Sequence, residues 1–232
     1  MKFKVLPEIF ERYPGLNLGL VKAWGIDNTG CSPDLEEMLR FIRSFIRKTY
    51  NSETLSAEPK INAWRNAYSS FGAKPKKYKS SVESLYRMTL KGIDFSINKV
   101  VDIYNYISLK YMIPLGGDDL DKIEGDILLG FAAEDKQFIP LNSDIPEIPK
   151  IGEVVYMDNN DILCRRWNWR ESDKTKMTER TRDVLLVIEA LPPFTKEELN
   201  LITTDLAGHV KKFCGGEIMT DHLFPERPEV EI

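Results

Sequence analysis

Apolar side chains recur every three or four residues through the first half of the chain, a spacing that predicts amphipathic helices. The first helix is expected to start at Ser32 and Pro33, with acidic residues near its amino end, and to finish near Lys48. A second helix is expected over 61–71, because Gly72 follows its last apolar position. These patterns place at least two helices before the middle of the chain.

Two further helices are marked by capping signals. Ser80 is followed three residues later by Glu83, a capping-box pattern that opens a helix through Leu90. Asn98 opens the next helix, which Pro114 ends.

The second half of the chain changes to the alternation and short apolar runs that are typical of strands. Asn159-Asn160-Asp161 is a hairpin turn signal, and Thr195 with Glu198 opens a final helix that glycines close at 215 and 216. Because helices lead and strands follow without regular alternation, the pattern favours an α+β fold over a doubly wound one. The expected strands cover 126–133, 137–141, 152–158, 162–170 and 183–191.

Composition and charge narrow the class of protein. The chain has 232 residues, 42% of them apolar and 29% charged, with a net charge of −4, as in an ordinary soluble domain. Any contact with nucleic acid must therefore come from a local basic patch. Cys31, Cys164 and Cys214 form no CxxC pair, so we expect no zinc site, no other metal, no cofactor and a reducing cytoplasmic setting. We expect neither a signal peptide nor a membrane span.

The usual catalytic signatures are missing from the sequence. It contains no HExxH, P-loop, GxGxxG or GxSxG motif. His209 and His222 are the only histidines, and we interpret both as structural or surface residues.

The most unusual stretch runs from Cys164 to Arg170. In an extended strand, Arg166, Asn168 and Arg170 would share one face, where guanidinium groups suit a carboxylate or phosphate. The competing interpretation is a half-buried strand with core tryptophans and solvated arginines. Both remain open at the level of sequence.

A basic segment supplies a second candidate surface. Lys76, Lys77 and Tyr78 could meet phosphates and stack on a base, and Arg65 on the preceding helix would extend this surface. A solvated loop is the plainer interpretation, which the acidic balance of the chain favours. The acidic run 118–121 is interpreted as a short helix start rather than a cation site.

One block resembles a known family. It is similar to the "IN-x-VVD-x-x-NY … PL-x-x-x-D" block of the B3/B4 editing domain in the phenylalanyl-tRNA synthetase β subunit. The resemblance covers about residues 62–192 of a single elaborated domain spanning 1–232, with 1–61 and 193–232 as additions. It implies a mixed, mostly antiparallel, partly barrel-like sheet flanked by helices. The block reads Ile97-Asn98-Lys99-Val100-Val101-Asp102-Ile103-Tyr104-Asn105-Tyr106, then Pro114-Leu115-Gly116-Gly117-Asp118-Asp119.

The resemblance also implies an editing-type pocket for an aminoacyl-tRNA ester. The family's asparagine falls on Asn105 and its glutamate near Val187 or Glu189, so Asn105 and Glu189 are the expected catalytic residues. The family's histidine falls on Gly116. We expect substrate contacts from Gly116 and Gly117 and from the unusual stretch, at Arg166, Asn168 and Arg170.

The sequence leaves three hypotheses. The first is a trans-acting aminoacyl-tRNA deacylase whose tRNA contacts are Arg65, Lys76, Lys77 and Tyr78. The second is a non-catalytic module that binds tRNA or a small amino-acid-like carboxylate, which the glycine at position 116 motivates. The third is a structural protein that shares only the fold.

Overall fold

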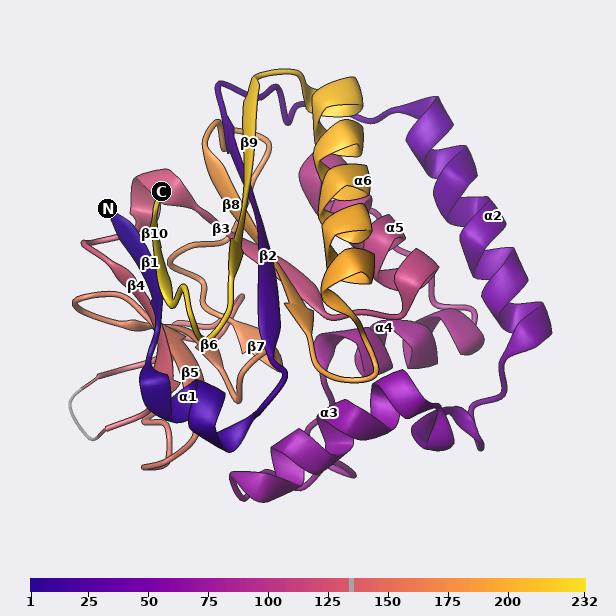
Figure 1. Ribbon diagram of the computed structural model, residues 1–232. Helices are drawn as coiled ribbons and strands as arrows, with labels where there is room; N and C mark the ends of the chain where they lie inside the picture. Colours follow the sequence, from indigo (N-terminus) through magenta and orange to yellow (C-terminus); the bar gives the residue numbers. More distant parts are fainter. Residues whose placement is uncertain (134–135) are drawn as a thin grey trace.

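The computed structural model describes residues 1–133 and 136–232 and has an α+β fold with two sheets and a helical layer (Figure 1). The α+β class and the mixed, mostly antiparallel pairing agree with the sequence prediction. Within the described ranges, no helix combines the length and apolarity needed to cross a bilayer.

The four-stranded sheet is antiparallel throughout, in the order β3-β8-β2-β9. Its strands are β3 (Leu115–Asp119), β8 (Val184–Ala190), β2 (Asn17–Trp24) and β9 (Glu217–Leu223). Helix α6 (Lys196–Cys214) lies along this sheet (Figure 1). The two layers approach closely at Gly19 of β2, where a Cβ atom would stand 2.2 Å from the Thr203 hydroxyl oxygen. Only glycine fits at this crossing.

The six-stranded sheet has the order β10-β1-β4-β5-β6-β7 and is mixed, because β1 and β4 run parallel. Each sheet has two free edges, so neither sheet closes into a barrel. The expectation of a partly barrel-like sheet was therefore wrong. The strands are β10 (Glu229–Glu231), β1 (Lys2–Val5), β4 (Ile127–Phe131), β5 (Val154–Met157), β6 (Ile162–Arg165) and β7 (Arg170–Glu171).

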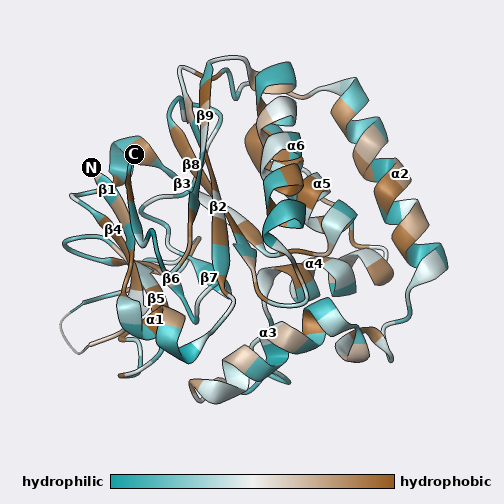
Figure 2. Cartoon of the chain, in the orientation of Figure 1, coloured by the Kyte–Doolittle hydropathy of each residue, from teal (hydrophilic) through white to brown (hydrophobic). Residues whose placement is uncertain are grey.

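Apolar and polar residues alternate along α2 and α6 (Figure 2), and α2 buries Leu35, Leu39 and Ile46 while Phe41 and Phe45 stay exposed. Helix α5 packs against α6 on one side and α2 on the other. The remaining elements are α1 (Pro7–Arg12), α2 (Pro33–Thr49), α3 (Pro59–Ser70), α4 (Ser81–Leu90), α5 (Lys99–Tyr111), and the short 3-10 helices η1 (Leu55–Ala57) and η2 (Leu120–Lys122).

Most predicted helix starts are confirmed by their caps. The Ser80 side chain accepts from the Glu83 backbone, Asn98 caps α5, and Thr195 with Glu198 forms a full capping box on α6. Glu83 departs from the capping-box pattern, because its buried carboxylate instead pairs with Arg65 and Arg87.

The strands were predicted less well than the helices. β4, β5, β6 and β8 lie inside predicted strands, whereas 137–141 forms only isolated bridges. β1, β2, β3, β9 and β10 were not predicted. β2 carries no alternation because nearly all of it is buried. Segments outside the resemblance are thus part of both sheets: β1 pairs with β4, and β2 lies between β8 and β9.

Candidate functional site

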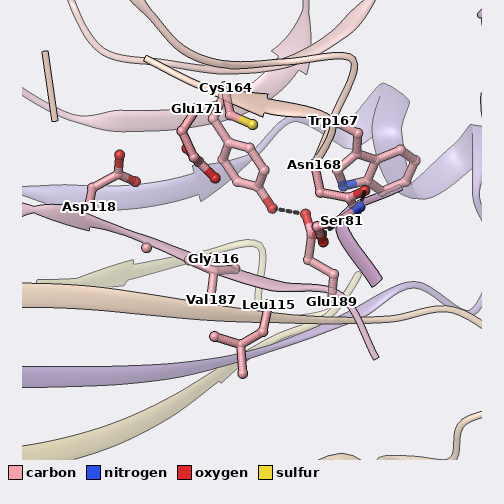
Figure 3. A pocket seen from close by; sticks show the side chains of 12 residues that line it. Ser81, Leu115, Gly116, Asp118, Cys164, Trp167, Asn168, Glu171, Val187 and Glu189 are labelled. Carbon is pink, nitrogen blue, oxygen red and sulfur yellow. Dashed lines mark hydrogen bonds between the residues drawn. The ribbon is translucent and has the colours of Figure 1, made fainter. Parts of the chain in front are cut away.

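A small cavity lies between the two sheets, where β3 and β8 face β5, β6 and the turn after β6 (Figure 3). We call it the inner cavity. Its volume is about 30 Å³, counted as space for the centre of a water molecule. Since one water-sized group needs roughly 10–15 Å³ by this measure, the cavity holds about two. It is lined by Ser81, Leu115, Gly116, Gly117, Asp118, Tyr156, Cys164, Trp167, Asn168, Glu171, Val187 and Glu189.

Glu189 is the centre of a buried hydrogen-bond network. Its carboxylate accepts from the Tyr156 hydroxyl at 2.5 Å and from the Asn168 amide nitrogen at 2.5 Å. The Asn168 amide oxygen in turn accepts from the Tyr68 hydroxyl at 2.9 Å. Burial raises the pKa of Glu189 from 4.5 to about 7, although the neighbouring Tyr156, Asn168 and Trp167 side chains favour the charged form. A carboxyl group with this pKa can exchange a proton near neutral pH.

Two more acidic side chains line the inner cavity. Asp118 is buried and accepts from the Thr175 hydroxyl at 2.5 Å, and burial raises its pKa to about 6. Glu171 is partly buried, and its pKa is raised well above the ordinary value. Desolvation is the main cause and repulsion from Asp118 is the second. Cys164 lies among them with a pKa raised by burial, so its thiol is protonated and is a poor nucleophile.

The two glycines of β3 lie close to neighbouring atoms, a flexible side chain at Gly116 and the backbone at Gly117. A Cβ atom on Gly116 would stand 2.9 Å from a Glu171 carboxylate oxygen, and one on Gly117 would stand 2.5 Å from the Leu185 backbone oxygen. The position where the resemblance placed a histidine is therefore filled from across the cavity by Glu171.

A wider groove opens beside the inner cavity, with a volume of about 330 Å³. We call it the outer groove. Asn105 of α5 and Arg170 of β7 line it, together with the Tyr104 and Trp169 rings. Ser81, Leu115, Gly116, Asn168 and Glu171 line both spaces. The outer groove and the inner cavity thus form one two-part site.

The strand predicted over 162–170 is confirmed only for 162–165, and the predicted shared face of Arg166, Asn168 and Arg170 is wrong. Strand β6 ends at Arg165, and Arg166 and Trp167 then adopt left-handed backbone angles with φ of 47° and 65°. This turn sends Asn168 into the inner cavity and leaves Arg170 exposed at the outer groove.

Arg166 lines neither space. Its guanidinium lies 3.1 Å from Glu153 and stacks on Tyr78 and Trp169, at 3.8 and 4.5 Å from the ring centroids. Trp167 is a core residue, packed edge-on against Trp64 and Tyr13. The structure therefore places an anchoring ion pair and a core tryptophan where the sequence suggested an anion-binding face.

The basic segment splits into two parts. Lys76 and Arg65 border a shallow hollow separate from the site, and Arg65 is neutralised by Glu83 at 2.9 Å. Lys77 lies over Tyr78, whose ring packs on Trp169 with centroids 4.9 Å apart. Tyr78 and Lys77 are thus joined to the outer groove through Trp169, whereas Arg65 and Lys76 are not.

The other candidate groups have structural explanations. His209 bonds within α6, and His222 of β9 lines a separate hollow beside the start of that helix. Glu124, Asp158 and Asp161 cluster with metal-like spacing, but the Lys174 ammonium pairs with all three at 2.8–2.9 Å. The acidic run begins a short helix as predicted, with the Asp119 side chain capping η2.

Several lining residues were missed by sequence reasoning. Tyr156, Cys164, Glu171 and Trp167 come from strands and a turn that reach the cavity only after the sheets pack. The one available signal was the acidic residue Glu171, which directly follows the stretch already marked as unusual.

The chain is therefore an α+β domain with two packed sheets, and the acid-lined cavity between them opens into a wider groove, the usual form of a small-ligand site. The sequence model of the B3/4 domain matches residues 63–217, and the chain belongs to this family. The match covers more than half of the chain and includes the Asn105, Gly116, Asn168 and Glu189 positions.

Two relatives illustrate the similarity. The chain is 26% identical over 111 residues to the phenylalanine–tRNA ligase β subunit of Fusobacterium nucleatum subsp. nucleatum, an alignment that covers 46% of this chain and 14% of that protein. Among solved structures, an N-terminal fragment of the phenylalanyl-tRNA synthetase β subunit from Pyrococcus horikoshii matches with a TM-score of 0.47 and 12% identity, over 95% of this chain and 53% of the fragment. The chain thus spans a minor part of the curated relative.

Proposed function

We propose that this protein binds the aminoacyl end of a charged tRNA and hydrolyses its ester. The observation that carries the proposal is the position of Glu189, a buried carboxyl group with a pKa near 7 beside space for a water molecule. Such a group is matched to general-base catalysis at neutral pH.

The roles follow from the two-part site. Glu189, oriented by Tyr156 and Asn168, takes a proton from a water in the inner cavity as that water attacks the ester carbonyl. The carbon–oxygen bond to the ribose breaks, and the proton passes to the leaving ribose oxygen. Each Glu189 oxygen has a second lone pair left for this exchange.

The outer groove is suited to the acceptor end of the tRNA. The Trp169 ring offers a stacking surface for a base, and Arg170 offers a fork of donors for a phosphate. Asn105, buried in α5, is placed to hold the ribose or the aminoacyl carbonyl. Lys77 beside Tyr78 continues the cationic surface outward.

The test is a panel of tRNAs, each charged with one amino acid, incubated with the wild type and with Glu189→Gln. We expect one ester to be cleaved well above the buffer rate. We expect Glu189→Gln to slow this cleavage by about 10²-fold or more, a typical contribution of a general base. Glu179→Gln, an exposed acid outside the site, is the matched control. If every ester survives at its buffer rate, the hydrolase proposal is wrong.

A non-catalytic binding module is the second candidate, and Gly116 favours it. The position that carries an imidazole in the related editing domains has no side chain here, and the Cys164 thiol stays protonated. In this case the same panel shows no cleavage, while charged tRNA still binds more tightly than uncharged tRNA in a gel-shift assay.

A further inference from the structure

The inner cavity is rich in acceptors and has no cation of its own. Asp118, Glu171 and Glu189 line it together, and none of them forms an ion pair with any residue in the ranges 1–133 and 136–232. The nearby cations are engaged elsewhere: Arg166 pairs with Glu153, and Lys174 pairs with the acidic cluster around Asp158.

The three carboxyl groups are not equivalent. Glu189 receives hydrogen bonds on both oxygens, whereas Asp118 receives one from Thr175. Glu171 lies at the junction of the inner cavity and the outer groove, with one oxygen against Gly116. The end of the cavity formed by Asp118 and Glu171 is therefore the part short of donors. A buried carboxylate without a cation or donors is costly and takes up a proton instead.

Unpartnered donors border the same cavity. The Trp167 side chain is completely buried, and its indole nitrogen makes no well-formed hydrogen bond in the described structure, although it lies close enough to Glu189 to favour the charged carboxylate. The Ser81 hydroxyl is also buried without a partner there. In Figure 3 the indole nitrogen faces toward Asn168 and Glu189, across the cavity from Asp118 and Glu171. Buried donors of this kind normally have an acceptor.

We propose that the Asp118–Glu171 end of the inner cavity binds a primary ammonium group of the ligand, next to donors that hold an adjoining carbonyl oxygen. The proposal rests on the proposed function in one respect, that the ligand enters by the outer groove. It adds to the proposed function a subsite at Asp118 and Glu171 and the requirement that the ligand carry a positive charge there. The inner cavity is small and opens into the outer groove, so the ammonium lies at its inner end while the rest of the ligand extends toward the groove.

The ammonium can belong to either end of an amino-acid ligand. An α-ammonium would lie next to the scissile carbonyl, and a side-chain ammonium would lie at the far end of the residue. Three probes of similar shape separate these sources. Norleucinamide carries only the α-ammonium, ε-aminocaproamide carries only the distal one, and caproamide carries neither.

The experiment is isothermal titration calorimetry of the full chain with each probe. We expect one of the two ammonium probes to bind about tenfold or more tightly than caproamide, because a close, desolvated charge pair contributes at least that much. Its binding should release protons, which appear as a dependence of the measured heat on the ionisation enthalpy of the buffer. Equal affinities for all three probes would overturn the proposal.

Variants locate the ammonium. Glu171→Gln and Asp118→Asn keep the shape of each side chain and remove its charge, and each should abolish most of the tenfold preference. Asp121→Asn, an exposed acid two residues beyond β3, is the control and should leave it unchanged. A preference that survives both cavity variants would place the ammonium elsewhere and overturn the assignment. If a variant does not fold, the three probes on the wild type still decide.

The two proposals fail in different ways. Loss of the ammonium preference with intact ester cleavage would reject only this inference. A charge-dependent preference for the probes without cleavage of any charged tRNA would reject only the hydrolase.

Discussion

Asn168 donates its amide hydrogen to Glu189 at 2.5 Å, joining the turn after β6 in one sheet to β8 in the other. The amide oxygen of the same Asn168 accepts from Tyr68 of α3, so one side chain links three elements. This link fixes the orientation of Glu189 and depends on the left-handed turn at Arg166 and Trp167.

Asn168→Ala should lower the free energy of unfolding by about 2–3 kcal/mol, because it leaves buried Tyr68 and Glu189 with an unmade hydrogen bond each. Urea unfolding followed by tryptophan fluorescence measures the loss. Asn66→Ala, at an exposed position in α3, is the matched control and should stay within about 0.5 kcal/mol of the wild type. Equal stability of the two variants would show that the network contributes nothing.

Gly116→Ala and Gly117→Ala should differ in how much stability each variant loses. At Gly116 the added methyl meets the end of a flexible Glu171 side chain, so we expect a loss of about 1 kcal/mol or less and a clear loss of probe binding. At Gly117 it meets a backbone oxygen 2.5 Å away, so we expect about 2–3 kcal/mol. Thermal unfolding with calorimetric binding checks both. The reverse order of stabilities would contradict the described packing of β3.

Stability should respond to pH through Glu189. Its folded pKa is raised from 4.5 to about 7, so between these values the folded state binds more protons than the unfolded state. This contribution is fully present below about pH 4.5 and is lost as the pH rises through 7, where it costs a few kcal/mol.

Other carboxylates with lowered pKa values, such as Asp126, act in the opposite direction at lower pH. The comparison is therefore the difference between wild type and Glu189→Gln, measured by urea unfolding at pH values from 5 to 8. That difference should shift in favour of the variant as the pH rises. A difference independent of pH would mean that Glu189 ionises at its ordinary pKa.

Cleavage of the charged tRNA should require ionised Glu189, so its rate should fall as the pH drops below about 7. Single-turnover rates over pH 6–8 measure this, after correction for the ester's own hydrolysis. A rate that rises toward acid pH would argue for Glu189 as a proton donor instead.

Lys77 and Lys76 should contribute unequally to tRNA binding, because only Lys77 adjoins the outer groove. Lys77→Gln should weaken tRNA binding and reduce the slope of its salt dependence by about one unit, since Lys77 adjoins the outer groove through Tyr78. Lys76→Gln should have a smaller effect, because Lys76 borders the separate hollow. Lys48→Gln on α2 controls for general charge. Equal effects at all three positions would indicate nonspecific binding.

The sequence by itself indicated helices α2 to α6, because their capping residues and apolar spacing are local, whereas the short helix α1 was not predicted. Ser80, Asn98 and Thr195 cap the helices where the sequence indicated. The block around Asn105 also indicated the family, and the stretch from Cys164 to Arg170 drew attention to a part of the site.

Only the tertiary structure decided how that site is built. The turn at Arg166 reverses the facing of the side chains that follow, and no local pattern distinguishes such a turn from a continuing strand. Glu171 reaches Gly116 across a gap that exists only when the two sheets pack. The chemistry of the cavity depends on burial and on neighbours distant in sequence, and neither can be predicted from a short segment of the sequence.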